Sequence, residues 1–243
     1  MEVNGVSWFQ ESFGEEYRLL YQHRDESEAQ TMANLIRSRA ATGWCGPALD
    51  VACGAGRHLR YLKGYSWVVG IDLSAPLLRV ARSTNHHAFL VQADMRALPF
   101  RSGVFTLVVN LFTSFGYFSD DAQNRSALDE IARVTAPSGW FVLDFFNAVH
   151  IRERLVRFDR QQVGSLVVEQ HREISIDGRY VQKAIAIIGA DRTFYERVRL
   201  FELNDLLLMM QSCRFEVREV LGDYSGGPIT ADSPRTILIA QRS

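Results

Sequence analysis

The chain has 243 residues, of which 47% are hydrophobic and 23% are charged, and its formal net charge is −1. This length and composition are typical of one large α/β domain, with or without an insertion, and the near-neutral charge disfavours nucleic acid as a partner. The N-terminal residues lack the features of a secretion signal, and no apolar run reaches the about 18 residues that a membrane span requires. We therefore expect a cytoplasmic protein with no membrane partner. The three cysteines, Cys45, Cys53 and Cys213, have unrelated spacings that predict neither a disulfide framework nor a metal site.

The first 46 residues are predicted to form a helical lid. Aromatic residues recur at three- and four-residue intervals between Trp8 and Tyr21, which gives the first helix an aromatic face. Tyr17 and Tyr21 on this face are candidates to cover a binding site. A second helix, expected over residues 26–40, has its apolar side at Ala29, Met32, Ala33 and Ile36 and is expected to cover the edge of a sheet.

Strand-like and helix-like segments alternate from Ala48 onward. Near-continuous apolar runs predict strands at residues 48–52, 67–71, 88–93, 105–109 and 140–146, and helices are predicted between them at 57–62, 75–82 and 121–134. Alternating elements with such apolar strands are typical of a parallel sheet that is covered by helices on both faces.

The alternation changes after Asn147. Residues 163–176 and 179–188 are rich in β-formers and are joined by Asp177-Gly178, a two-residue hairpin signal, and residues 194–201 add a third strand. We expect a small antiparallel sheet over residues 150–201, which could form the wall of a substrate pocket or the contact of a homodimer. It interrupts a main domain of residues 47–149 and 202–243, which ends with a helix at 204–212 and strands at 216–221 and 236–241.

A glycine-rich turn follows the first of these strands. The sequence Asp50-Val-Ala-Cys-Gly-Ala-Gly56 carries an acid in the apolar run and two glycines in the turn, and a helix-like segment comes next. Such a turn at the carboxyl end of a strand forms a nucleotide-binding crevice in open α/β sheets. Ala52 stands where the first glycine of a dinucleotide-binding motif would be, so the strict spacing of that motif is missed.

Three acids, Asp50, Asp72 and Asp94, stand at the ends of three successive predicted strands. The carboxyl ends of parallel strands lie along one edge of the sheet, so these acids are expected to lie near each other. Asp72 follows Asp50 by 22 residues, the spacing of a carboxylate that binds both ribose hydroxyls of an adenosine. Asp94 is placed to accept a hydrogen bond from an adenine amino group.

These motifs resemble those of the class I S-adenosylmethionine-dependent methyltransferases over nearly the whole chain. The glycine motif, the acid of Gly70-Ile-Asp-Leu-Ser74, the segment Gln92-Ala-Asp-Met95 and the strand end Val108-Val-Asn-Leu-Phe112 all have counterparts in that family. The resemblance implies a Rossmann-like seven-stranded sheet whose last strand is antiparallel. It also implies S-adenosylmethionine as cofactor, S-adenosylhomocysteine as product and no metal. The implied cofactor-binding residues are Tyr17, Tyr21, Asp50, Ala52, Gly54, Gly56, Asp72, Leu73, Asp94, Met95, Asn110 and Leu111.

The stretch from Asn110 to Phe118 bears on the methyl acceptor. It is similar to the Phe-Ser-Ser-Ile-Gly-Tyr segment of bacterial enzymes that dimethylate the amine of a deoxyamino sugar, and amino-acid N-methyltransferases are arranged similarly. The Asn-Pro-Pro-Tyr and Pro-Cys motifs of relatives that modify nucleobases or glutamine amides are missing after this strand. A small-molecule acceptor is therefore favoured, with nitrogen ahead of oxygen.

Candidate acceptor residues lie on the same edge of the predicted sheet. Tyr117, with Tyr21, is the catalytic candidate, because its hydroxyl could orient an amine or remove its proton late. The substrate-binding candidates are Tyr117, Asp144, Asn147, Asp223 and Arg235. Arg235 could bind a carboxylate or phosphate by a bidentate contact, or it could pair with Asp223 and hold the last loop.

Four other functions stay open at this point. O-methylation of a small molecule and methylation of RNA use the same cofactor motifs. A non-catalytic partner protein that binds S-adenosylmethionine would also keep them. A nicotinamide-dependent oxidoreductase shares the fold logic, but the missing third glycine and the acid at Asp94 count against it.

Overall fold

The computed structural model describes residues 2–3, 6–7, 26–40, 46–189 and 193–243. Tyr17, Tyr21 and the rest of the predicted aromatic helix lie outside the described residues, as does Cys45. Two short strands, β1 (Glu2–Val3) and β2 (Val6–Ser7), pair antiparallel where we predicted helix. The sequence between them is Asn-Gly, which favours two-residue hairpin loops, and the aromatic periodicity that predicts helix begins only at Trp8.

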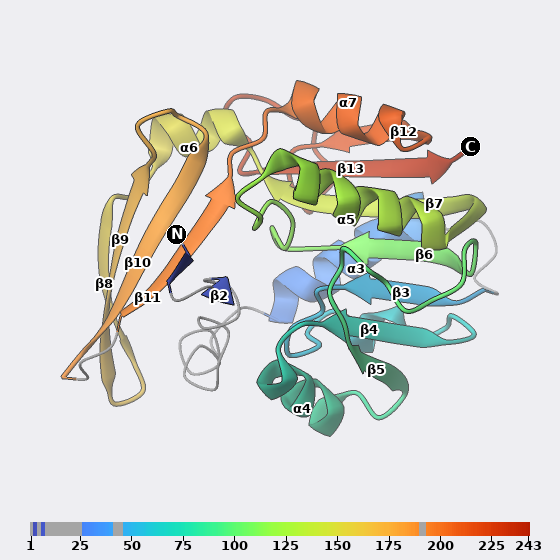
Figure 1. Ribbon diagram of the computed structural model, residues 1–243, viewed down its shortest axis with the longest axis horizontal. Coiled ribbons are helices and arrows are strands. Elements are labelled where there is room, and N and C mark those ends of the chain that lie inside the picture. The colour runs from blue at the N-terminus through green and yellow to red at the C-terminus, as the bar shows by residue number, and fades with distance from the viewer. Residues whose placement is uncertain (1, 4–5, 8–25, 41–45, 190–192) are drawn as a thin grey trace.

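The main domain is a seven-stranded sheet with the strand order β12-β13-β7-β6-β3-β4-β5 (Figure 1). Its strands are β3 (Ala48–Val51), β4 (Val68–Asp72), β5 (Ala88–Gln92), β6 (Phe105–Asn110), β7 (Thr135–Phe146), β12 (Phe215–Leu221) and β13 (Arg235–Arg242). Strands β7, β6, β3, β4 and β5 are paired in parallel, whereas β13 runs antiparallel to both β7 and β12. The predicted fold class, with its antiparallel last strand, is confirmed.

Helices cover both faces of this sheet, as the apolar strands predicted. On one face, α5 (Asp121–Val134) and α7 (Leu203–Ser212) pack through Ile131 and Met210 onto the sheet. On the other, α3 (Glu26–Arg39), the 3-10 helix Leu59–Leu62 and α4 (Ala75–Thr84) bury residues that include Met32 and Leu78. The Oγ atom of Ser74 accepts a hydrogen bond from the backbone of Leu77, which fixes the start of α4 beside the glycine turn.

A separate antiparallel sheet stands beyond the carboxyl ends of β3 and β6 (Figure 1). It contains β8 (Phe158–Val163), β9 (Leu166–Ile174), β10 (Tyr180–Ile188) and β11 (Thr193–Arg199) in the order β11-β10-β9-β8. The sequence predicted neither β8 nor the short helix α6 (Ala148–Arg154) that precedes it. β8 is polar at four of its six positions, so the pattern of apolar residues that marks a strand is weak there.

Among the described residues, no helix is both long and apolar enough to cross a membrane.

Candidate active site

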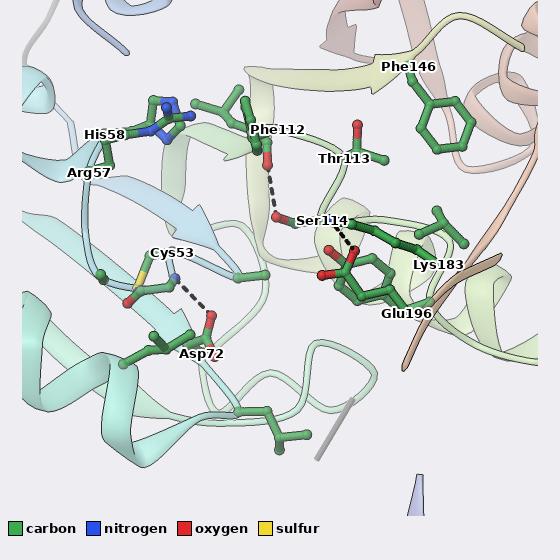
Figure 2. A pocket seen from close by; sticks show the side chains of 18 of the residues that line it. Cys53, Arg57, His58, Asp72, Phe112, Thr113, Ser114, Phe146, Lys183 and Glu196 are labelled. Carbon is green, nitrogen blue, oxygen red and sulfur yellow. Dashed lines mark hydrogen bonds and ion pairs between the residues drawn. The ribbon is translucent and has the colours of Figure 1, made fainter. Parts of the chain in front are cut away.

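A cavity of about 830 Å³ lies between the carboxyl ends of the parallel strands and the inserted sheet. Figure 2 shows Cys53 and Asp72 on one side of it, and Lys183 and Glu196 on the side of the inserted sheet. The predicted site residues that line the cavity are Ala52, Gly54, Asp72, Leu73, Asp94, Met95, Leu111, Tyr117 and Arg235. Those among the described residues that do not line it are Asp50, Gly56, Asn110, Asp144, Asn147 and Asp223.

The two glycines of the turn serve different purposes. Gly54 has a φ of +55°, and the nearest atom to a Cβ added there would be 3.9 Å away, so this glycine leaves the cavity side of the turn open. Gly56 has a φ of +80°, and a Cβ there would lie 2.6 Å from Nδ2 of Asn85, so this glycine permits close packing of the turn on α4. Ala52 also adopts a left-handed conformation, with a φ of +60°, which is uncommon for a residue with a side chain.

Asp72 fastens the glycine turn to the end of β4. Its Oδ2 accepts a hydrogen bond from the backbone of Gly54 at 2.8 Å, and its Oδ1 accepts one from the backbone of Ser74 at 2.8 Å. Burial raises the pKa of Asp72, and these backbone hydrogen bonds oppose the rise. Because each carboxylate oxygen can accept more than one hydrogen bond, Asp72 can also accept bonds from ligand hydroxyls.

Asp50 lies within β3, two residues before Ala52, and is only 1% exposed. Its Oδ2 has no hydrogen-bond partner among the described residues. Burial, followed by the charge of Asp72, raises the pKa of Asp50 to about 8. A buried carboxyl oxygen without a partner is uncommon in folded proteins and marks a place where a ligand or an ordered water can supply the missing bond.

Asp94 follows β5 and is held by Arg96. Two nitrogens of the guanidinium contact the two carboxylate oxygens at 2.6 to 3.1 Å, and Arg96 also lies 4.5 Å from the ring centre of Phe118. Partial burial raises the pKa of Asp94, but the hydrogen bonds from Arg96 outweigh it and lower the pKa overall. The cavity edge therefore keeps an anionic carboxylate at this position.

Asp144 holds the turn that follows β6. It is fully buried and accepts hydrogen bonds from the backbone of Phe112 at 2.8 Å, from the Tyr224 hydroxyl at 2.9 Å and from Nε of Arg235 at 2.7 Å. Phe112 and Thr113 both have left-handed backbones, with φ of +59° and +60°. Two successive residues of this kind are strained unless their surroundings fix them, and Asp144 supplies that support.

The guanidinium of Arg235 completes this cluster. It donates to Oγ1 of Thr113 at 3.1 Å as well as to Asp144. Burial is the largest single influence and lowers the pKa of Arg235, but the charge of Asp144, the neighbouring Tyr224 and the hydrogen bond to Asp144 together raise the pKa overall. Burial and then Asp144 raise the pKa of Tyr224. Arg235 therefore stays cationic and Tyr224 stays protonated beside the cavity.

The predicted ion pair between Asp223 and Arg235 does not form, because Arg235 pairs with Asp144 instead. The Asp223 carboxylate accepts hydrogen bonds from the backbones of Ser225 and Gly227 within its own loop. Asn147 caps α6 and donates to the carbonyl oxygens of Thr230 and Ser233, each at 2.9 Å. Asp144, Asn147 and Asp223 thus fix the loops around the cavity, and their side chains do not reach it.

The sequence reasoning missed the polar wall that the inserted sheet gives to the cavity. This wall consists of Asp159, Gln161, Gln170, Arg172, Lys183 and Glu196. In each strand these residues alternate with residues of the other sheet face. Residues 169–173 are polar on both faces, so no alternation of polar and apolar residues marks the wall in the sequence. Arg57 was missed too; its guanidinium lies 4.4 Å from the ring centre of Phe112.

The chemistry of the strand ends can be compared with the cofactor that the motifs imply. S-adenosylmethionine is a cation with ribose hydroxyls and an adenine amino group. The carboxylates of Asp72 and Asp94, the unpartnered oxygen of Asp50 and the open space at Gly54 fit such a ligand. The described residues contain no group of three or more His, Cys, Asp or Glu side chains placed to hold a metal ion.

Comparison with known proteins agrees with a site for S-adenosylmethionine. A protein family described as "Methyltransferase domain" matches residues 48–139. The chain is 34% identical over 132 residues to the dTDP-3-amino-3,6-dideoxy-alpha-D-glucopyranose N,N-dimethyltransferase of Streptomyces fradiae. This match covers 53% of this chain and 51% of the relative. It is 37% identical over 133 residues to the dTDP-3-amino-3,4,6-trideoxy-alpha-D-glucopyranose N,N-dimethyltransferase of Streptomyces venezuelae, with 53% and 54% covered. The matched segment thus spans about half the length of these curated relatives.

A solved structure extends the likeness to the full length. The sugar N-methyltransferase KedS8 from Streptoalloteichus superposes with a TM-score of 0.71 at 25% identity, and the superposition covers 100% of this chain and 98% of that one. The inserted sheet therefore belongs to the shared architecture.

Proposed function

We propose that this chain is a class I S-adenosylmethionine-dependent methyltransferase that transfers a methyl group to an amine nitrogen of a small molecule. The observation that carries the proposal is the pair of carboxylates that end or follow β4 and β5, Asp72 and Asp94, which line the cavity beside an open glycine turn. The matches to N,N-dimethyltransferases of amino sugars support nitrogen as the acceptor atom.

On the cofactor side, we assign Asp72 to the ribose hydroxyls and Asp94 to the adenine amino group. Leu73, Met95 and Leu111 line the same part of the cavity and give apolar surface for the adenine ring. Ala52 and Gly54 give the ligand room along the turn. Asp50 does not line the cavity, so we assign it to the positive end of the cofactor through its charge alone, because a nearby cation would favour the ionised carboxyl.

Four further residues are assigned to the cofactor from outside the cavity or from outside the described residues. Gly56 packs the turn on α4, and Asn110 donates to the carbonyl oxygen of Val51 at 2.9 Å, so both hold the cofactor loop in place. Tyr17 and Tyr21 remain proposed contacts of the predicted lid.

When bound, S-adenosylmethionine supplies an activated methyl group on its sulfonium. The task of the chain is therefore mainly to align the acceptor nitrogen behind that methyl group, and alignment alone can contribute much of the rate. Tyr117 lines the cavity beside the turn that Asp144 and Arg235 hold. We assign the Tyr117 hydroxyl to orienting the amine, and Asp144, Asn147, Asp223 and Arg235 to positioning the loops around the acceptor.

The proposal is tested by turnover. Purified protein is incubated with S-adenosylmethionine and a panel of small amines and matched alcohols, and products are followed by mass spectrometry. We expect a mass gain of one or two methyl groups on an amine together with release of S-adenosylhomocysteine. Methylation of the alcohols alone would contradict the nitrogen assignment, and release of no S-adenosylhomocysteine with any acceptor would favour the non-catalytic alternative.

The Tyr117→Phe variant tests the assignment of that hydroxyl. We expect kcat for the accepted amine to fall about five- to tenfold, because the loss of one orienting hydrogen bond costs roughly 1 to 1.5 kcal/mol. The affinity for S-adenosylhomocysteine should not change. Equal turnover by both proteins would remove Tyr117 from the reaction.

A cytoplasmic location and a homodimer remain predictions from the sequence. The described cysteines, Cys53 and Cys213, are free and buried. The inserted sheet ends in two edge strands, β8 and β11, and such edges can pair with a second copy.

A further inference from the structure

The segment of residues 114–120 lies between β6 and α5 and carries Tyr117, the residue assigned to the acceptor amine. One of its attachments is a backbone hydrogen bond: the N–H of Arg199, at the end of β11, donates to the carbonyl oxygen of Gly116 at 2.7 Å. Gly116 has a φ of +84°, and a Cβ there would lie 3.3 Å from the carbonyl oxygen of Arg199. The segment therefore passes close to the inserted sheet just before Tyr117.

Two side chains of the inserted sheet hold the other end of this segment. The Tyr180 hydroxyl donates to the carbonyl oxygen of Ser119 at 2.9 Å, and Nε of Arg199 donates to Oδ1 of Asp121, the first residue of α5, at 3.0 Å. Figure 1 shows the end of β11 beside the start of α5. Tyr180 is 4% exposed and the Arg199 side chain is 11% exposed, so both are largely buried. Tyr117 thus lies between two attachments to the inserted sheet.

Tyr180 and Arg199 do not line the cavity themselves. Their neighbours Val181 and Val198 do, and alternate residues of a strand point to opposite faces of the sheet, so Tyr180 and Arg199 lie on the face that turns away from the cavity. A change to either side chain therefore reaches an acceptor in the cavity only through the parts of the chain that it holds.

We propose that Tyr180 and Arg199 are positioning residues for the acceptor. They fasten the segment of residues 114–120 to the inserted sheet, and this sets the distance between the Tyr117 hydroxyl and the polar wall of that sheet. An acceptor that contacts both is then aligned behind the methyl group, and a small misplacement of an aligned group reduces the rate strongly. The inference rests on the proposed amine methyl transfer and on the role assigned there to Tyr117.

Hydrogen exchange tests the attachment directly. Tyr180→Phe keeps the ring and removes only the hydroxyl that reaches Ser119. In protein saturated with S-adenosylhomocysteine, we expect the backbone amides of residues 114–120 to exchange about three- to tenfold faster in this variant, as followed by mass spectrometry of peptides. One hydrogen bond contributes about that factor to the equilibrium between a held and a released segment. The affinity for S-adenosylhomocysteine should not change.

Kinetics test the link to Tyr117. In Tyr180→Phe, kcat for the accepted amine should fall by the same factor, about three- to tenfold. A double-mutant cycle with Tyr117→Phe then separates positioning from general destabilisation. If Tyr180 acts through the Tyr117 hydroxyl, Tyr180→Phe should cost nothing further in kcat once that hydroxyl is absent. A merely structural role would give the same loss in both backgrounds.

Two further variants complete the design. Arg199→Lys keeps a positive charge beside Asp121 but loses the guanidinium, which also donates to two backbone carbonyl oxygens. It should act in the same direction as Tyr180→Phe, and it decides the question if Tyr180→Phe does not fold. Tyr195→Phe is the matched control, because Tyr195 is 54% exposed in β11 and does not line the cavity. This control should change neither the exchange of the segment nor kcat.

The outcomes separate the two proposals. If the unmodified protein methylates no amine, or if Tyr117→Phe is equally fast, the proposed function or its assignment of Tyr117 fails, and this inference fails with it. If both hold, but Tyr180→Phe leaves either the exchange of the segment or kcat unchanged, the positioning role alone is overturned. Equal losses of kcat with and without the Tyr117 hydroxyl also overturn it, because Tyr180 then acts by another route.

Discussion

At the residue scale, the carboxyl groups of Asp50, Asp72 and Asp94 differ in what surrounds them. Asp94 pairs with Arg96, Asp72 accepts backbone hydrogen bonds, and one oxygen of Asp50 has no partner among the described residues. Near neutral pH the Asp50 carboxyl is mostly protonated, since its pKa is about 8, while Asp94 is ionised. A cationic ligand would draw Asp50 into the ionised form and release a proton.

This difference predicts opposite pH dependences of stability. The pKa of Asp50 rises from 3.8 unfolded to about 8 folded, so the unfolded chain loses this proton first and stability falls as pH rises from about 4 to 8. Asp50→Asn removes that fall, and its stability relative to the unmodified protein should increase with pH over this range. The midpoint of chemical denaturation, measured at several pH values, checks this.

Asp94→Asn is the control of opposite sign. In the unmodified protein, the folded pKa of Asp94 lies below its unfolded value of 3.8. The ionised Asp94 carboxylate therefore contributes stability that is present above pH 3.8 and is lost as pH falls through the folded pKa. The Asn variant should therefore be less stable near pH 7, and the difference should shrink in acid. Parallel curves for Asp50→Asn and the unmodified protein would contradict the placement of a neutral carboxyl at Asp50.

Asp72 gives a prediction about binding. Asp72→Ala removes the carboxylate assigned to the ribose hydroxyls and should weaken S-adenosylhomocysteine at least about tenfold, since a hydrogen bond to a charged group is worth roughly 1.5 to 3 kcal/mol. Asp72 also holds the backbones of Gly54 and Ser74, so thermal melting must show that the variant is folded. Unchanged affinity in a folded variant would refute the location of the cofactor.

At the element scale, the glycine turn and the Phe112–Thr113 turn both line the cavity. Each turn is held by a buried polar side chain from a neighbouring element. Asn85, at the end of α4, donates to the carbonyl oxygen of Gly56 at 3.1 Å, and Asp144, in β7, accepts from the backbone of Phe112 at 2.8 Å. The geometry of the cavity therefore depends on side chains that do not touch it.

The two glycines of the first turn should respond differently to substitution. Gly56→Ala places a Cβ 2.6 Å from Asn85 at a positive φ and should destabilise the fold by roughly 1 to 3 kcal/mol. Gly54→Ala meets no close atom, so its cost in stability should be smaller, but its methyl group enters the cavity side and should weaken S-adenosylhomocysteine. Denaturation midpoints and calorimetric affinities distinguish them. A larger loss of affinity in a folded Gly56→Ala variant would reverse these assignments.

The second turn depends on the buried pair of Asp144 and Arg235. Asp144→Asn leaves the guanidinium, whose side chain is 16% exposed, without its carboxylate and should destabilise the protein by about 3 to 5 kcal/mol. The double variant Asp144→Asn/Arg235→Gln should recover part of this loss, because no unpaired charge remains. Asp223→Asn in the neighbouring loop is the control and should cost less. Additive losses in the double variant would show that the pair does not act as a unit.

At the scale of the whole molecule, much of the main domain could be predicted from the sequence. The apolar runs give its strands because a strand buried on both faces is apolar throughout, and α5 begins at Asp121 and ends at Val134 as predicted. β8 and α6 could not be predicted, since β8 is polar and partly exposed and α6 has only seven residues. The pairing of Asp144 with Arg235 joins residues 91 positions apart, and no local pattern encodes such a contact.

The inserted sheet was predicted as an element, but its cavity wall was not. Strand periodicity indicates which residues share a face, whereas the face that turns to the cavity is decided by how the sheet stands on the main domain. This explains why the sequence predicted Tyr117, which follows β6 near the cofactor motifs, as a site residue. It did not predict Arg172 or Lys183, which also line the cavity.

The central claim is that the carboxyl groups around the glycine turn bind S-adenosylmethionine, and calorimetric titration with S-adenosylhomocysteine tests it most directly. NADH is the control ligand, and Asp72→Ala is the control protein. The account predicts micromolar binding of S-adenosylhomocysteine, no binding of NADH and a loss of at least about tenfold in Asp72→Ala. Binding of NADH instead, or no binding of S-adenosylhomocysteine, would contradict it.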